Sequence, residues 1–105
     1  MEFIETPVFT KEVRRLLDDA TYQALQFALL LRPEQGKVIP GSGGLRKLRW
    51  RSKGRGKRGA LRLIYYQDVG GESLYLLYLY EKSAHEDLTT EQLRILSRIV
   101  REELK

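Results

Sequence analysis

Two runs of β-forming residues joined by a short glycine turn constrain this fold more than any other feature of the chain. The first run, LRLIYYQ, covers residues 61–67, and the second, SLYLLYLY, covers residues 73–80. Between them, DVGGE at 68–72 has two adjacent glycines, which can take the positive φ that a tight hairpin needs. The second run is apolar on both faces, which is typical of a strand buried inside a sheet. We therefore expect an antiparallel strand pair at the centre of the protein.

Two further segments have the alternation of strands. EFIE at 2–5 predicts a first strand. RKLRWR at 46–51 predicts a half-buried strand, because Leu48 and Trp50 fall on one side and the basic residues on the other. VIPGSGGL at 38–45 contains too much glycine for a regular element and predicts a loop.

Helical spacing and capping signals appear on both sides of these strands. Thr6 before Pro7 is typical of a helix start. Asp18 separates this helix from a second one, which ends before Pro33 because the residue preceding a proline avoids the helical region. We expect these two short helices to be antiparallel.

A third helix is predicted at the C-terminal end. Thr89 with Gln92 three residues later forms a capping-box pattern. An apolar stripe then follows at helical spacing: Leu93, Leu96, Val100 and Leu104. The element order is β-α-α-β-β-β-α, which predicts an α+β fold with an antiparallel sheet and helices packed on it.

Length and composition fit one soluble domain over residues 1–105. Hydrophobic residues make up 42% and charged residues 31% of the chain, as in ordered globular proteins. There is no cysteine, no basic leader at the N-terminus and no apolar run long enough to span a bilayer. We therefore expect a cytoplasmic protein that does not act at a membrane.

Charge is distributed very unevenly. Between Gln35 and Gln67 there are ten Lys/Arg and no Asp/Glu, whereas the rest of the chain has nine Lys/Arg and fourteen Asp/Glu. The window thus carries +10 and the remainder −5. Such a segment repels itself, which favours an anionic partner. Nucleic acid is favoured most, while an acidic protein, a membrane surface or a plain solvated loop stay open.

The residue types argue against metal and dinucleotide chemistry. The chain has one histidine, no cysteine and no spaced carboxylate cluster. GRGKRG at 54–59 matches a dinucleotide fingerprint, but that motif must open a helix, whereas here it opens a strand. RNA carries its own nucleophile, the ribose 2′-hydroxyl. A cluster of lysine and arginine can therefore cleave RNA without a metal, by acid–base catalysis and phosphate binding.

Arg62 and Lys82 are the candidates that this argument selects. Arg62 lies within an otherwise apolar and aromatic strand, where it would be held rigidly. Its alternative is an edge arginine paired with Glu72 or Glu81. Lys82 follows the last strand and should lie near Arg62 if the hairpin forms; its alternative is a solubilising lysine at a strand end.

Aromatic residues and the single histidine have weaker functional signals. Four tyrosines in the two central strands could stack on bases, although most are expected in the core, as is Trp50. His85, within EKSAHEDL, is either an exposed histidine near two acids or a supporting residue of an RNA site. The tyrosines are Tyr65, Tyr66, Tyr78 and Tyr80.

These motifs together resemble the RelE/HigB-type toxins of bacterial toxin–antitoxin operons, and the HigB-like branch most. The likeness spans nearly the whole chain and is most specific in GKRGALRLIYY at 56–66 and in Tyr80-x-Lys82. It departs from the pattern in having no tyrosine after Tyr80. Those toxins are ribosome-dependent endoribonucleases that cut mRNA and are held inactive by a cognate antitoxin.

The resemblance implies particular roles and partners. Arg62 would stabilise the scissile phosphate, and Lys53, Lys57 and Lys82 would supply acid–base or charge-stabilising groups. The partners would be the ribosome with its mRNA and a helix-turn-helix antitoxin of the HigA type, with no cofactor and no metal. The remaining basic residues of the window would bind RNA: Arg46, Lys47, Arg49, Arg51, Arg55 and Arg58.

Two other functions stay open at this stage. A non-catalytic RNA- or ribosome-binding module would use the same basic window. A ParE-like toxin of the same fold would inhibit DNA gyrase instead, although that activity would not require the cluster of Arg62, Lys57 and Lys82.

Overall fold

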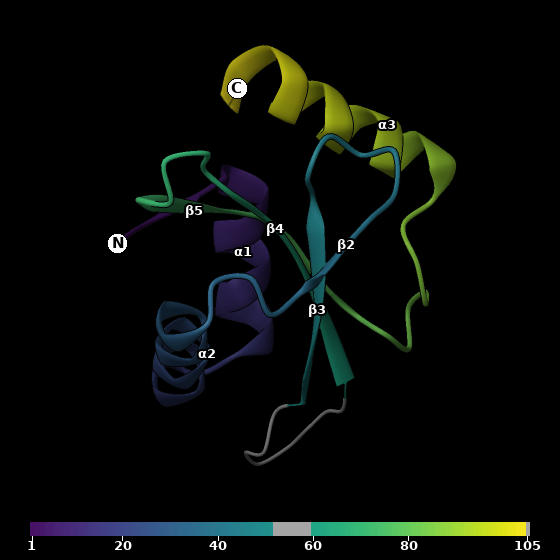
Figure 1. Cartoon of the computed structure of the whole chain (residues 1–105). Coiled ribbons are helices and arrows are strands. Elements are labelled where there is room, and N and C mark those ends of the chain that lie inside the picture. Colours follow the sequence, from purple (N-terminus) through teal and green to yellow (C-terminus); the bar gives the residue numbers. More distant parts are fainter. Residues whose placement is uncertain (52–59, 105) are drawn as a thin grey trace.

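The structure is a computed structural model that describes residues 1–51 and 60–104. A five-stranded sheet forms its centre, with the strand order β1-β5-β4-β3-β2. Helices α1 and α2 lie on one face and α3 on the other (Figure 1). The elements are β1 (Glu2–Glu5), α1 (Pro7–Leu16), α2 (Asp19–Leu31), β2 (Lys37–Val38), β3 (Arg46–Arg51), β4 (Ala60–Gln67), β5 (Ser73–Glu81), α3 (Thr90–Ile99) and a π-helical turn over Val100–Leu104.

The strand pairing confirms the predicted α+β fold and corrects it at both edges. Strands β3, β4 and β5 are antiparallel neighbours, and β4 is the central strand of the sheet. The sheet is mixed, however, because β1 pairs in parallel with β5, with Glu2 opposite Ser73. The predicted loop at 38–45 is wrong at its first residue, since Lys37–Val38 forms the short strand β2 against β3. Pairings between segments so far apart leave no local signal in the sequence.

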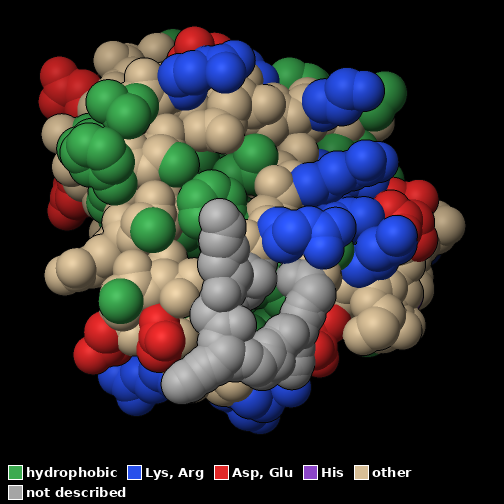
Figure 2. Space-filling view, turned by 90° about the horizontal axis from the view of Figure 1, so that it is seen from below, with side chains coloured by type: hydrophobic (Ala, Val, Ile, Leu, Met, Phe, Trp, Pro, Cys, Tyr) green, Lys and Arg blue, Asp and Glu red, His purple; other side chains and the backbone are tan. Residues whose placement is uncertain are grey.

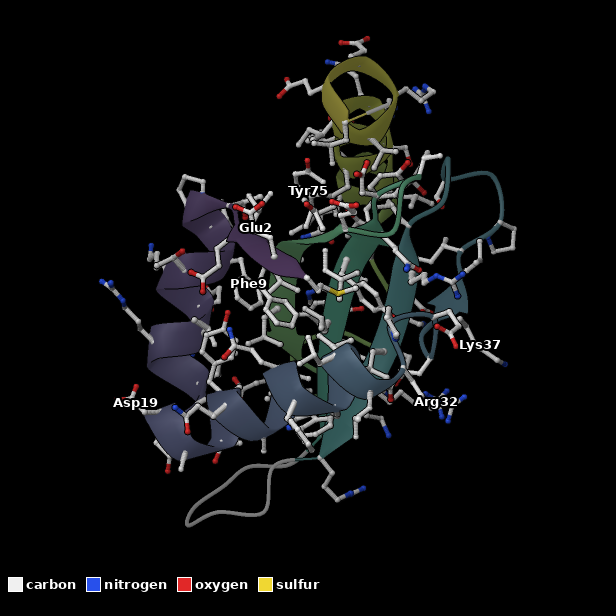
Figure 3. All side chains as sticks on the ribbon, turned by 60° about the vertical axis from the view of Figure 1, so that its left-hand side comes forward. Glu2, Phe9, Asp19, Arg32, Lys37 and Tyr75 are labelled. Atoms are coloured by element: carbon white, nitrogen blue, oxygen red, sulfur yellow. The ribbon has the colours of Figure 1, made fainter. Side chains whose placement is uncertain are left out.

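The first helical layer covers one face of the sheet. Phe9 of α1 points into this layer and is fully buried, together with Leu25 and Leu29 of α2 (Figure 3). The predicted helix start is confirmed, because the side chain of Thr6 accepts a hydrogen bond from the amide of Phe9. The expected antiparallel arrangement is wrong: α1 and α2 cross (Figures 1 and 3). Leu17 and Asp18 are both extended, so the chain turns a corner between the helices.

Helix α3 covers only part of the second face. Its capping box is confirmed, since Thr89 and Gln92 exchange side-chain to backbone hydrogen bonds. The core on this side includes Ile64, Tyr66 and Val100. The segment 82–89 passes back along the sheet from the end of β5 to α3 (Figure 1). No helix within the described part of the chain is long and apolar enough to cross a membrane.

Candidate phosphate-binding site

Arg62 lies in the central strand and is almost completely buried, with 3% of its surface exposed. It shares a strand face with Ile64 and Tyr66, and so faces the α3 side of the sheet. Directly opposite it lie Arg49 on β3 and Tyr80 on β5. The three side chains therefore form one row across three hydrogen-bonded strands, and the rigid centre of the sheet positions the arginine.

The guanidinium of Arg62 is paired with a carboxylate that the sequence alternatives did not include. Its Nη2 donates to Oε2 of Glu86 at 2.9 Å, and Nη1 donates to the backbone oxygen of Leu61 at 3.3 Å. Nε is buried and has no hydrogen-bond partner among the described residues. The alternative of an edge arginine paired with Glu72 or Glu81 is wrong, because β4 is central and Glu86 is the partner.

Lys82 lies close enough to this pair to act on it electrostatically. It directly follows β5, and its backbone amide donates to the oxygen of Ala60 at 3.0 Å. The hydrogen bond from Arg62 holds the pKa of Glu86 below its usual range, and the charges of Arg62 and Lys82 add to this effect. The hairpin therefore brings Arg62 and Lys82 to the same end of the sheet.

A second carboxylate from the same segment pairs with a lysine of the neighbouring strand β3. Asp87 accepts a hydrogen bond from Nζ of Lys47 on β3. This bond lowers the pKa of Asp87, and the charges of Arg62 and Arg49 lower it further. Lys47 and Arg49 therefore lie on the same basic face as Arg62, and the acids at 86 and 87 lie over that face.

Tyr80 and His85 form the aromatic part of the site. Their rings stack with centroids 4.2 Å apart and planes at 6°. The Tyr80 hydroxyl donates to the backbone oxygen of Glu86 at 3.3 Å. Burial raises the pKa of Tyr80 to about 12, so the phenol keeps its proton at neutral pH. Nδ1 of His85 lies 2.9 Å from the oxygen of Asp87. These contacts hold segment 85–87 against the end of β5.

The structure separates the other predicted RNA-binding residues. Arg51 lies at the exposed end of β3 on the same side as Arg49. Arg46 has the strand parity of Leu48 and points to the opposite face, where its Nη1 donates to the oxygens of Glu34 and Gly36. The remaining candidates lie outside the described residues: Lys53, Arg55, Lys57 and Arg58.

Most of the predicted stacking residues are part of the core. Tyr65 is fully buried; its hydroxyl donates to the oxygen of Pro33 at 2.7 Å and accepts from the amide of Gly36 at 2.9 Å. Tyr66 is also buried, and Trp50 packs against the α1–α2 core. Tyr80 is buried and Tyr78 packs against the core on the α3 side, so all five aromatic residues have roles in packing.

Sequence reasoning missed Glu86 and Asp87, and it gave His85 only a weak role. The available signal was the cluster HED, in which both acids follow directly on the histidine and lie just beyond the predicted lysine at 82. Which cations these acids would meet could not be deduced, because the contacts are made across the fold. Figure 2 shows the result as Lys and Arg side chains gathered on one side of the molecule with acidic side chains beside them.

The described part of the chain is therefore an α+β fold whose central strand carries a nearly buried arginine, which is paired with a carboxylate of the same chain. No group of three or more His, Cys, Asp or Glu that could hold a metal occurs within residues 1–51 and 60–104.

Comparison with solved structures gives this fold a name. No protein-family model matches the chain. An arginine double mutant of the E. coli toxin RelE in the free state is similar, with a TM-score of 0.58 and 18% identity over 81% of this chain and 86% of that one. The intact E. coli RelBE toxin–antitoxin complex also contains a similar chain, with a TM-score of 0.56 and 19% identity over 76% of this chain and 94% of that one. The chain therefore has the RelE fold, and these structures do not single out the HigB branch.

Proposed function

We propose that this chain is the toxin of a bacterial type II toxin–antitoxin pair and cleaves mRNA on the ribosome without a metal. The observation that carries the proposal is Arg62, a nearly buried arginine in the central strand of a RelE fold, aligned with Arg49 and Tyr80. A buried cation is costly, so an arginine at this position needs a reason beyond stability. Binding a phosphate that becomes more negative during reaction is such a reason.

The reaction is a transesterification within the RNA. The 2′-hydroxyl attacks the adjacent phosphorus and loses its proton to a base, while the bond from phosphorus to the 5′ oxygen breaks and that oxygen receives a proton. The products are a 2′,3′-cyclic phosphate and a free 5′-hydroxyl. Arg62 stabilises the negative oxygens of the pentacoordinate phosphorus. Lys82, with Lys53 and Lys57, supplies the acid–base groups, a division of roles that rests on the family resemblance.

We propose that the same face explains the partners. A small basic patch has little surface with which to read a base sequence, so the ribosome would present the mRNA to it. An antitoxin encoded beside the toxin, as in the RelBE pair, would keep this cytoplasmic enzyme inactive. The HigB-like branch and a HigA-type helix-turn-helix antitoxin are the more specific form of this proposal.

The test is cleavage of mRNA on translating ribosomes, in the Mg²⁺ buffer that ribosomes require, by the wild-type protein, by Arg62→Met and by Arg14→Met. Arg14 is exposed on α1, on the opposite face of the sheet, and provides the matched control. We expect Arg62→Met to lose roughly a hundredfold or more in cleavage rate at saturating ribosomes, as when one preorganised donor is removed. Arg14→Met should cleave like wild type.

The outcomes separate the alternatives. Equal losses in both variants, or normal cleavage by Arg62→Met, would show that Arg62 has no catalytic role. Ribosome binding without any cleavage by the wild-type protein would favour the non-catalytic RNA-binding module. Inhibition of gyrase without an effect on translation would favour the ParE-like alternative.

A further inference from the structure

The anion site around Arg62 is occupied by the chain's own carboxylates. Glu86 accepts from Arg62 and Asp87 accepts from Lys47, so two adjacent acids meet two cations on two neighbouring strands. The two partners of each ion pair come from different parts of the fold. The acids belong to the segment between β5 and α3, whereas the cations belong to strands of the sheet. The basic face is therefore partly neutralised before any ligand arrives.

We infer that Glu86 and Asp87 are an internal competitor for the phosphates of RNA, and that RNA binds this face by displacing them. The inference rests on the proposed function for the identity of the ligand, a single-stranded RNA phosphodiester. Glu86 and Asp87 then set how readily the basic face accepts RNA. Arg62 stays in place while the carboxylates leave.

Burial on the two sides of each ion pair supports this exchange. The side chain of Arg62 is 4% exposed, whereas that of Glu86 is 48% exposed. For the second pair, the corresponding values are 22% for Lys47 and 69% for Asp87. The exposed carboxylates are solvated once they leave, and a phosphate that takes their place restores the counter-charge that the buried Arg62 needs, so the exchange of one anion for another leaves no cation unpaired. The cations remain fixed by their strands, which is the arrangement expected of a preorganised site with a removable occupant.

The hydrogen-bonding groups of the site can accommodate a phosphodiester as the displacing ligand. A guanidinium can bind two oxygens of a phosphate in parallel, whereas Glu86 accepts from Arg62 through Oε2 at Nη2. Nε of Arg62 is buried with no partner in residues 1–51 and 60–104, so the guanidinium has unused hydrogen-bonding capacity. Successive phosphates of one strand could meet Arg62 and Lys47 together, as the two successive acids do now.

A purely structural role for Glu86 makes the opposite prediction. If its only function were to neutralise and orient Arg62, then removing its charge would disorder the arginine and weaken anion binding. A competitor that is removed strengthens binding. The sign of the change in affinity therefore distinguishes the two roles.

The experiment measures binding of a short 2′-O-methyl RNA, which has no nucleophile and cannot be cleaved, to the isolated protein. Glu86→Gln is compared with Glu72→Gln, which makes the same chemical change at an exposed residue just before β5, at the other end of that strand. Both variants gain one unit of net charge, so general attraction is matched. We expect Glu86→Gln to bind about tenfold more tightly than Glu72→Gln, which corresponds to about 1.4 kcal/mol.

Asp87→Asn is a second variant that leaves the pair between Arg62 and Glu86 intact. We expect it to bind more tightly than Glu72→Gln, by a smaller factor than Glu86→Gln, because Asp87 is the more exposed acid. Inorganic phosphate, titrated in parallel, should show the same order of affinities. If both variants bind the RNA no more tightly than Glu72→Gln, the inference is overturned.

Two further measurements identify the ligand and separate failure of this inference from failure of the proposed function. An acidic peptide of Glu and Asp is titrated alongside, and a larger gain for the peptide than for RNA would overturn the assignment to a phosphodiester. Binding is measured without ribosomes or cleavage. Tighter RNA binding by Glu86→Gln therefore supports the inference even if no mRNA cleavage is found, a result that would overturn only the proposed function.

Discussion

At the scale of single residues, Arg62 is the position where stability and function oppose each other. It is nearly buried, its Nε has no partner among the described atoms, and its single carboxylate partner is half exposed. Placing a cation in such surroundings costs desolvation energy that one ion pair does not fully return. An apolar residue of similar length would fit the same strand without that cost.

We therefore expect Arg62→Met to stabilise the protein while it abolishes the proposed activity. Glu86 is half exposed and is solvated once Arg62 is gone, so removal of the buried cation should gain about 1 kcal/mol, which raises the Tm of a domain of this size by roughly 4 °C. The change in Tm and in the free energy of unfolding is measured by thermal and denaturant unfolding of the wild type, Arg62→Met and Arg14→Met. A lower Tm for Arg62→Met alone would mean that Arg62 supports the fold.

At the scale of elements, the segment between β5 and α3 holds Glu86 and Asp87 over the basic face of the sheet. The backbone bond from Lys82 to Ala60 fixes its start, and the capping box at Thr89 fixes its end. Between them, His85 stacks on Tyr80, and Glu86 and Asp87 reach the basic face. The segment is thus attached at both ends, and its two carboxylates pair with the sheet while remaining partly exposed to solvent.

Acid should weaken this attachment. The pKa values of Glu86 and Asp87 are both lowered in the folded protein, chiefly by their hydrogen bonds to Arg62 and Lys47. Their pairs therefore stabilise the fold above the ordinary carboxyl pKa of about 4, and this contribution is lost as pH falls through the lowered values.

The measurement is Tm between pH 7 and pH 3 for the wild type and for the double variant Glu86→Gln with Asp87→Asn. The double variant should lose less Tm on acidification, because it lacks both titrating groups. Parallel curves for the two proteins would mean that these pairs do not contribute to stability.

At the scale of the whole molecule, the fold concentrates charge of one sign on one face. The basic window lies within a chain whose other residues are acidic overall, and some of those acids fold back onto the window's cations. Apolar surface is exposed elsewhere, on α2, where Phe27 and Leu31 are more than half exposed. RNA binding by the basic face should therefore be strongly electrostatic.

Binding of a single-stranded RNA should weaken by roughly a hundredfold between about 50 and 200 mM salt, as for about five phosphate contacts. Arg49→Gln should lower the slope of log affinity against log salt by about 0.7, the value for one lost contact. Arg14→Gln, on the other face, should leave the slope unchanged. A flat salt response would mean that the basic face does not contact the RNA backbone.

The sequence by itself determined the local elements and the chemistry they carry. Alternation placed Arg62 on a strand beside apolar residues, and the capping patterns at Thr6 and Thr89 located two helix starts. These features depend on neighbours a few residues away, so the residue pattern contains them. The basic window could also be identified from the sequence, because counting charges requires no knowledge of the fold.

Only the tertiary structure decided which groups meet. Arg62 and Glu86 are 24 residues apart, and nothing local links them. The parallel pairing of β1 with β5 and the crossing of α1 and α2 are likewise set by packing on the finished sheet. Burial, too, is a property of the folded chain. Arg62 lies on a predicted strand, but only the assembled sheet shields it almost completely from solvent, and only the fold brings a carboxylate to it.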